Sequence, residues 1–255
     1  MNRSRTSRRT VAVGVVVGLS LLATALLGGS ASGESGGSPA SAFGPAPDPP
    51  ASYWQIGYYT PSKVGTLSYA EAFRGSGIAS LKFTSLPNTA LLITGQKAKY
   101  GSLLGDRSGA TSISTTVTLS SVTGLFKYYG EPSCGLPQDG GPTANFRFYF
   151  QTSNAGGFDE THYWWSNPVS RPLTGPKALP ETMNLENPFG STSGAFWSDY
   201  YGHSGADPSY KAGFEKAISN ITDIGVSFGG GCFFENGVGE TNGSATFTLN
   251  AFNVQ

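Results

Sequence analysis

The chain has 255 residues, of which only 13% are charged, while 36 residues are glycine and 13% are aromatic. Its sixteen basic and sixteen acidic residues balance, but four of the arginines lie within the first nine residues, so the chain from residue 32 onward carries a formal charge of −4. No basic cluster remains there that could hold nucleic acid or an anionic membrane surface, and we therefore expect no partner of either class. Few charges combined with many Gly, Tyr and Phe residues are typical of exported β-proteins.

The first 31 residues have the order of an export signal, which is positive, then apolar, then small. Four arginines precede an uncharged stretch over residues 10–32, and cleavage is predicted after Ala31. We therefore predict a secreted, extracellular protein with no stable membrane insertion after cleavage. The apolar run over residues 11–27 is near the lower limit for crossing a bilayer, so a retained anchor is the alternative. The pair Arg8-Arg9 leaves open a twin-arginine export route.

Residues 32–50 are mainly Gly, Ser, Ala and Pro, with only Glu34 and Asp48 charged. Such a segment cannot bury enough apolar surface to offset its ordering entropy, so a flexible spacer is predicted. The remaining residues, 51–255, have a suitable length for a single β-sandwich domain.

Alternation of apolar and polar residues predicts most of the strands. In residues 144–151 three phenylalanines share one face, and residues 112–119 alternate in the same way. In the last predicted strand the parity shifts after Leu249, as a β-bulge would produce. Further strands are predicted at residues 81–83, 90–94, 224–228 and 245–254.

Only residues 210–221 have apolar positions at helical spacing. The turn dipeptides Asn236-Gly237 and Asn242-Gly243 separate the strands that follow this helix. The predicted fold is therefore all-β, an antiparallel jelly-roll-like β-sandwich with one short helix before the final hairpin.

The two cysteines, Cys134 and Cys232, are 98 residues apart. In an oxidising compartment they are predicted to form a disulfide that ties one loop to the closing hairpin. In the chain-entropy model such a bridge would contribute about 4–5 kcal/mol. A pair of reactive thiols is the alternative.

Residues 217–226, with the glycine-rich hairpin and the strand at 245–254 that follow, resemble the end of laminin-IV-like and galactose-binding-like jelly rolls. Residues 77–83 resemble the early core strand of the same domains. These domains are similar in architecture to many carbohydrate-binding modules. The resemblance implies a jelly-roll sandwich and favours a binding role, and it implies a structural calcium ion as an optional feature.

Two aromatic clusters are candidate ligand sites, because sugar C–H faces stack on flat rings while nearby polar groups bond the hydroxyls. The first occupies residues 158–165, and the alternative for it is a core strand with its rings on both faces. The second occupies residues 196–203, within a region at 167–209 that is predicted to be irregular. The predicted ligand-binding residues are Tyr163, Trp164, Trp165, Trp197, Asp199, Tyr200 and Tyr201.

Neither a metal site nor a catalytic motif stands out. The only histidines, His162 and His203, lack metal-ligand spacing, so the metal ligands are left unassigned and no cofactor is predicted. A nucleophile elbow is missing from the sequence, although several carboxylates could supply a glycosidase acid and base. These are Asp159, Glu160, Glu181, Glu186 and Glu235.

The sequence as a whole predicts a secreted, non-catalytic module that binds a polysaccharide or cell-surface glycan, so that its partner is a glycan or a cell-surface component. A structural or adhesive protein that binds another protein is the first alternative, and a glycan-acting hydrolase is the second. The oligomeric state is left open.

Overall fold

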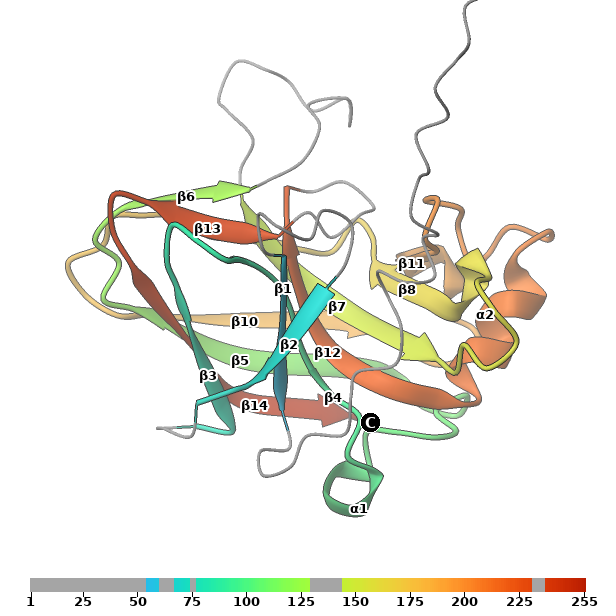
Figure 1. Ribbon diagram of the computed structural model, residues 1–255. Coiled ribbons are helices and arrows are strands. Elements are labelled where there is room, and N and C mark those ends of the chain that lie inside the picture. Colours follow the sequence, from blue (N-terminus) through green and yellow to red (C-terminus); the bar gives the residue numbers. More distant parts are fainter. Residues whose placement is uncertain (1–53, 60–66, 74–76, 129–143, 231–236) are drawn as a thin grey trace, which may run out of the picture. The chain divides into compact units, whose positions relative to one another are not determined.

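The computed structural model describes residues 54–59, 67–73, 77–128, 144–230 and 237–255 (Figure 1). These residues form two antiparallel β-sheets packed as a sandwich, which confirms the predicted fold class. The predicted leader, the spacer and both cysteines lie outside the described residues, as does Asn236. Within the described part of the chain, no helix has the length and hydropathy needed to span a bilayer.

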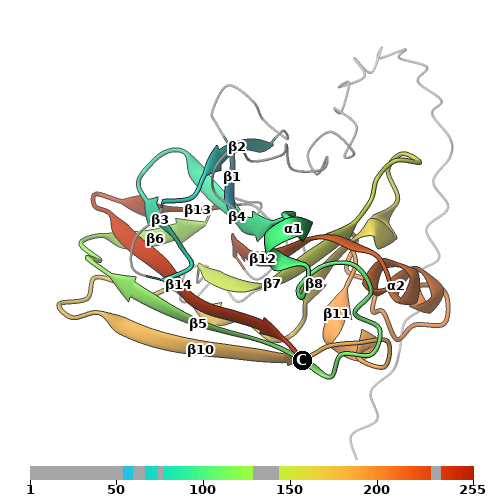
Figure 2. The same cartoon turned by 90° about the horizontal axis from the view of Figure 1, so that it is seen from below.

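The smaller sheet has four strands in the order β10-β5-β14-β3. Figure 2 shows β10, β5 and β14 side by side. The register between β5 and β14 shifts between Leu249 and Ala251, which confirms the predicted bulge. The four strands are β3 (Ala79–Phe83), β5 (Ser112–Ser120), β10 (Glu181–Pro188) and β14 (Ala245–Val254).

The larger sheet has ten strands, with β11-β8-β7-β12-β4-β1-β2 as its main path. Strand β13 pairs with β4 and β6, and β9 pairs with β7. The main-path strands are β1 (Gln55–Tyr59), β2 (Leu67–Glu71), β4 (Asn88–Thr94), β7 (Asn145–Thr152), β8 (Tyr163–Ser166), β11 (Trp197–Ser198) and β12 (Ile221–Gly229). The other three are β6 (Leu125–Tyr128), β9 (Arg171–Pro172) and β13 (Val238–Thr241).

The core between the sheets is built by the alternating strands that the sequence predicts. Three phenylalanines of β7 point into it, together with apolar residues of β5, β12 and β14. Phe83 and Phe247 approach Phe228 edge-on, with ring centroids 5.1 and 5.0 Å away. Fully burying side chains of this size contributes about 1.5–3 kcal/mol each, so this layer is a main source of the stability of the sandwich.

Four short helices accompany the sheets in the part of the chain that the structure describes. Helix α2 begins and ends within the predicted helix, but Ile221 is the first residue of β12 rather than the last turn of a helix. Ile221 instead bonds to Gly105 through both backbone groups and is buried. The helices are α1 (Lys97–Tyr100), α2 (Lys211–Ile218) and the 3-10 turns η4 (Glu160–His162) and η5 (Gly194–Phe196).

The prediction that residues 167–209 form an irregular region is wrong, because this region contains β9, β10 and β11. Strand β10 pairs with β5 over eight residues. Its inward positions include Asn187, a polar residue that is fully buried and bonds the backbone oxygens of Pro188 and Phe196. A polar residue at a core position conceals the alternation that would have predicted this strand.

Glu240 on β13 carries a buried carboxyl group, and we expect its ionisation to lower the free energy of unfolding. Its exposed fraction is 1%, and among the described residues neither carboxyl oxygen has a partner with the distance and angles of a good hydrogen bond. Burial raises its pKa, and the nearby N–H of Gly124 opposes this shift only in part. Between the ordinary pKa and the raised one the folded chain binds more protons than the unfolded chain, so the free energy of unfolding falls as pH rises through this interval.

We therefore expect Glu240→Gln to raise the free energy of unfolding by about 1 kcal/mol near neutral pH and to leave it unchanged below about pH 4. Urea unfolding at both pH values measures this difference. Glu186→Gln is the matched control, because Glu186 is exposed on β10. An equal effect of Glu240→Gln at both pH values would contradict the prediction.

Candidate ligand-binding site

Strand β8 places its three aromatic residues on two faces of the ten-stranded sheet. Trp164 points into the core, where its ring lies 4.9 Å from that of Phe214 and its Nε1 donates to the oxygen of Thr161 at 2.7 Å. Tyr163 and Trp165 lie on the outer face, in a second apolar cluster. The sequence alternation assigned these faces correctly.

Trp197 also belongs to the core. Its ring centroid lies 4.9 Å from Phe150 and 5.2 Å from Phe189, and its Nε1 donates to the oxygen of Pro188 at 2.9 Å. A ring that stacks on a sugar must present a face to solvent, whereas the rings of Trp164 and Trp197 are fully buried. In this structure both tryptophans therefore serve the packing of the sandwich.

The outer face of the large sheet carries a chain of aromatic rings that we call the aromatic band. Trp165 lies 5.0 Å from Tyr149 and 6.3 Å from Tyr200 between ring centroids. Tyr200 in turn lies 5.2 Å from Tyr201 and 5.2 Å from Phe158, both edge-on. The band consists of Tyr149, Phe158, Tyr163, Trp165, Tyr200 and Tyr201.

The aromatic band has a buried end and an accessible end. Tyr149, Tyr163 and Trp165 are buried, Phe158 and Tyr200 are half-buried, and Tyr201 is 51% exposed. The predicted site residues are thus divided by the fold: Tyr163 and Trp165 support the band, and Tyr200 and Tyr201 bring it to the surface.

Asp199 builds the turn that presents the two accessible tyrosines. Its carboxylate is fully buried, and one oxygen accepts the N–H groups of Tyr201 at 3.0 Å and His203 at 2.8 Å. The other oxygen lies 3.0 Å from Nδ1 of His203. Gly202 has a φ of 88°, the left-handed conformation that glycine adopts readily. Asp199 is therefore a positioning residue for the accessible end of the band.

The ring of His203 is itself held in place, because it stacks on Tyr210 with centroids 3.9 Å apart and an interplanar angle of 6°. His162 bonds Asn154 at 2.9 Å, and the amide of Asn154 donates to the hydroxyl of Tyr163. Both histidines thus have polar side-chain partners. Among the described residues, no three His, Cys, Asp or Glu side chains come together in a way that could hold a metal ion.

Sequence reasoning missed a polar network on the same face of the sheet. The hydroxyl of Tyr149 donates to Gln151 at 2.5 Å, and Gln151 donates to the buried carboxylate of Asp223 at 3.0 Å. Two buried hydroxyls on this face, of Tyr69 and Ser227, have no hydrogen-bond partner among the described residues. A buried polar atom without a partner commonly marks a position where water or a ligand binds.

The pKa values of the tyrosines on this face keep their hydroxyls protonated. Burial raises the pKa of Tyr69, and the negative charge of Asp223 adds to the shift. Burial also raises the pKa values of Tyr163 and Tyr200, each further raised by a neighbouring tyrosine. These groups therefore remain hydrogen-bond donors at neutral pH and above.

The carboxylates considered as glycosidase groups lie in different parts of the fold. Asp159 and Glu160 lie at η4, and Glu181 and Glu186 lie on β10, whereas Glu235 is outside the described residues. Burial alone would raise the pKa of Asp159, but bonds from the hydroxyl and N–H of Thr161, with the nearby charges of His162 and Lys216, lower it.

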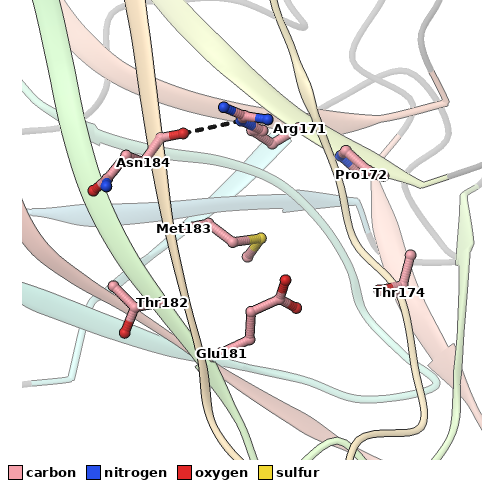
Figure 3. Close-up of a pocket in the computed structure, with 7 residues that line it drawn as sticks. All are labelled: Arg171, Pro172, Thr174, Glu181, Thr182, Met183 and Asn184. Carbon is pink, nitrogen blue, oxygen red and sulfur yellow. Dashed lines mark hydrogen bonds between the residues drawn. The ribbon is translucent and has the colours of Figure 1, made fainter.

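A separate cleft of about 340 Å³ opens where β9 and β10, which belong to different sheets, lie close together (Figure 3). Of the residues that line it, the sequence indicates only Glu181 as a candidate functional group. The cleft is lined by Arg171, Pro172, Thr174, Glu181, Thr182, Met183 and Asn184.

No protein-family model and no curated protein matches this chain. Residues 217–226, which resemble the end of galactose-binding-like jelly rolls, form the end of α2 and the first part of β12. Residues 77–83 contain β3. What the structure supports of this resemblance is the antiparallel β-sandwich itself.

Proposed function

We propose that this chain is a secreted, non-catalytic module that binds a polysaccharide or cell-surface glycan through the accessible end of the aromatic band. The observation that carries the proposal is the surface formed by Tyr201, Tyr200 and Phe158. These rings lie within 6.3 Å of one another between centroids, and Tyr201 is half-exposed. Aromatic rings at an accessible surface, with polar tips, suit a ligand that has both apolar C–H faces and hydroxyls.

The buried end of the band makes this surface rigid before any ligand binds. Tyr200 packs on both Tyr163 and Trp165, and Asp199 fixes the backbone on either side of Tyr201. Binding to a surface that is already ordered costs less conformational entropy than binding to a mobile loop. Rigid rings beside hydrogen-bonding groups therefore favour recognition of a glycan.

A binding role is favoured over hydrolysis by the state of the carboxyl group of Asp159, one of the candidate glycosidase groups. A glycosidase needs one carboxyl group with a raised pKa as general acid. Asp159, which lies next to Phe158, has a lowered pKa and uses one carboxyl oxygen to bond Thr161. Export is part of the same proposal, and its support is the leader-like order of residues 1–31.

The test is a glycan array followed by calorimetry with the best-binding glycan. We expect Tyr201→Ala to weaken binding by at least about tenfold, which corresponds to about 1.4 kcal/mol, because the ligand loses its main stacking surface. Tyr201→Phe keeps the ring and should stay within about threefold of the wild-type affinity.

Phe73→Ala is the matched control, since Phe73 is an aromatic residue that is 62% exposed and lies before β3, outside the aromatic band. The affinity of the Phe73→Ala variant for the glycan should equal that of the wild type. Failure of every glycan to bind above background would overturn the proposal. If a protein ligand bound instead, the adhesive alternative would replace it.

A further inference from the structure

The cleft between β9 and β10 has the composition of a second binding site. Strand β9 belongs to the ten-stranded sheet and β10 is the edge strand of the other sheet, so the cleft lies at the rim of the sandwich. In Figure 3 the side chains of Met183 and Glu181 point into the space between the two strands, whereas those of Thr182 and Asn184 point away. Its volume of about 340 Å³ lies within the range of small-ligand sites, at the lower end.

Arg171 supplies the cleft with an uncompensated positive charge. Its Nε donates to the backbone oxygen of Asn184 at 2.9 Å, which fixes the guanidinium group (Figure 3). Among the described residues, no carboxylate lies within ion-pair distance of Arg171. The N–H groups of both terminal guanidinium nitrogens are therefore available to a ligand. They have the forked arrangement that binds a carboxylate through two parallel hydrogen bonds.

Glu181 does not cancel this charge. It forms an ion pair with Lys177 at 2.5 Å, and when Lys177, which is not itself a lining residue, is counted with Arg171 and Glu181, the three side chains sum to one positive charge. The chain beyond its leader is negatively charged overall, which makes a local positive site distinctive. An anionic group is therefore the ligand feature that fits next to Arg171.

The remaining walls suit a hydroxylated ring rather than a bare anion. Met183 and Pro172 offer apolar surface for C–H groups, and Thr174 and Glu181 offer hydrogen-bonding oxygens. We propose that the cleft binds a uronic acid residue of an acidic saccharide, with Arg171 holding its carboxylate and Met183 packing on its ring. The inference goes beyond the glycan site proposed above, since the cleft and the aromatic band share no residue.

Met183 gives a direct probe, because the only other methionine of the chain is Met1. In full-length protein with ¹³C-labelled methionine methyl groups, galacturonate should shift the Met183 signal in a saturable manner. Galactose, which lacks the carboxylate, and acetate, which lacks the ring, should each bind at least about tenfold more weakly. High salt should weaken the binding of galacturonate, because the site is exposed and charged.

Two variants that should change the affinity for galacturonate in opposite directions complete the test. Arg171→Gln should weaken galacturonate binding by at least about tenfold, and Glu181→Gln should strengthen it by about twofold or more because a like charge is removed. Lys82→Gln is the control for a lost surface charge, since Lys82 is exposed on β3 in the same sheet as β10. The affinity of the Lys82→Gln variant for galacturonate should equal that of the wild type.

Equal binding of galacturonate and galactose, or an unchanged affinity in Arg171→Gln, would overturn the proposal. Equal binding of acetate would reduce the cleft to a simple anion site and overturn it as a saccharide site. Tyr201→Ala should leave the Met183 response intact, so a failure of this proposal is distinguishable from a failure of the aromatic-band site.

Discussion

Replacing Trp197 with alanine is expected to lower the free energy of unfolding by about 3–5 kcal/mol. The ring is fully buried and packs on Phe150 and Phe189, so its removal leaves a large cavity at the end of the core. The oxygen of Pro188 also loses the hydrogen bond from Nε1, although it keeps a longer one from Asn187. Few surface substitutions approach this magnitude.

Urea unfolding followed by circular dichroism measures the change without depending on tryptophan fluorescence. The neighbouring Phe196→Ala is the matched control, since that ring is 40% exposed and its loss should cost about 0.5 kcal/mol or less. A cost below about 1 kcal/mol for Trp197→Ala would show that the ring is not part of the core. Trp197 would then return to the group of candidate ligand-binding residues.

The strands that sequence reasoning predicted are those whose buried faces are mainly apolar. Strand β7 places three phenylalanines on its core side, and three of the four buried positions of β5 are apolar, with Thr115 at the fourth, so period two can still be recognised in both. Strand β10 has the same geometry, but Asn187 occupies one of its core positions. That residue is tolerated because its amide bonds two backbone oxygens, and those partners are contacts that only the folded chain brings together.

The candidate site was predicted in part for a related reason. Alternation shows that Tyr163 and Trp165 share a face opposite Trp164, but with three aromatic residues in a row it cannot show which face is the core. Contacts across the sheet are harder still to predict. Gln151 meets Asp223 because β7 and β12 pair in one particular register, and a shift of one residue would move Asp223 to the core side.

The cleft could not be predicted from the sequence either, because its residues also meet only through contacts between strands. Arg171 and Glu181 lie only ten positions apart in the sequence, yet one belongs to a strand that pairs with β7 and the other to a strand that pairs with β5. Their approach depends on how the two sheets are stacked, which no local pattern determines. Sequence reasoning therefore identified residues with suitable chemistry, and the sheet pairing decided which of them come together.

Asp199→Ala should reduce stability and glycan binding together. The substitution removes the acceptor of two backbone N–H groups and the partner of His203, and a buried donor without a partner costs about 1–3 kcal/mol. We expect the free energy of unfolding to fall by about 2–4 kcal/mol. Binding of a glycan at the aromatic band should weaken by at least about tenfold, because Tyr200 and Tyr201 lose their fixed positions.

Asp207→Asn and Asp199→Asn separate the positioning role of Asp199 from a general loss of charge. Asp207 also bonds a backbone N–H, that of Ser209 at 2.8 Å, but it is exposed, so its substitution should change stability by about 0.5 kcal/mol or less and leave binding unchanged. Asp199→Asn keeps an oxygen for the N–H groups of Tyr201 and His203 and should retain most of the affinity. Full glycan affinity in a folded Asp199→Ala variant would show that the turn does not position the ligand. The accessible rings would then have to be held by the buried end of the band alone, through the packing of Tyr200 on Tyr163 and Trp165.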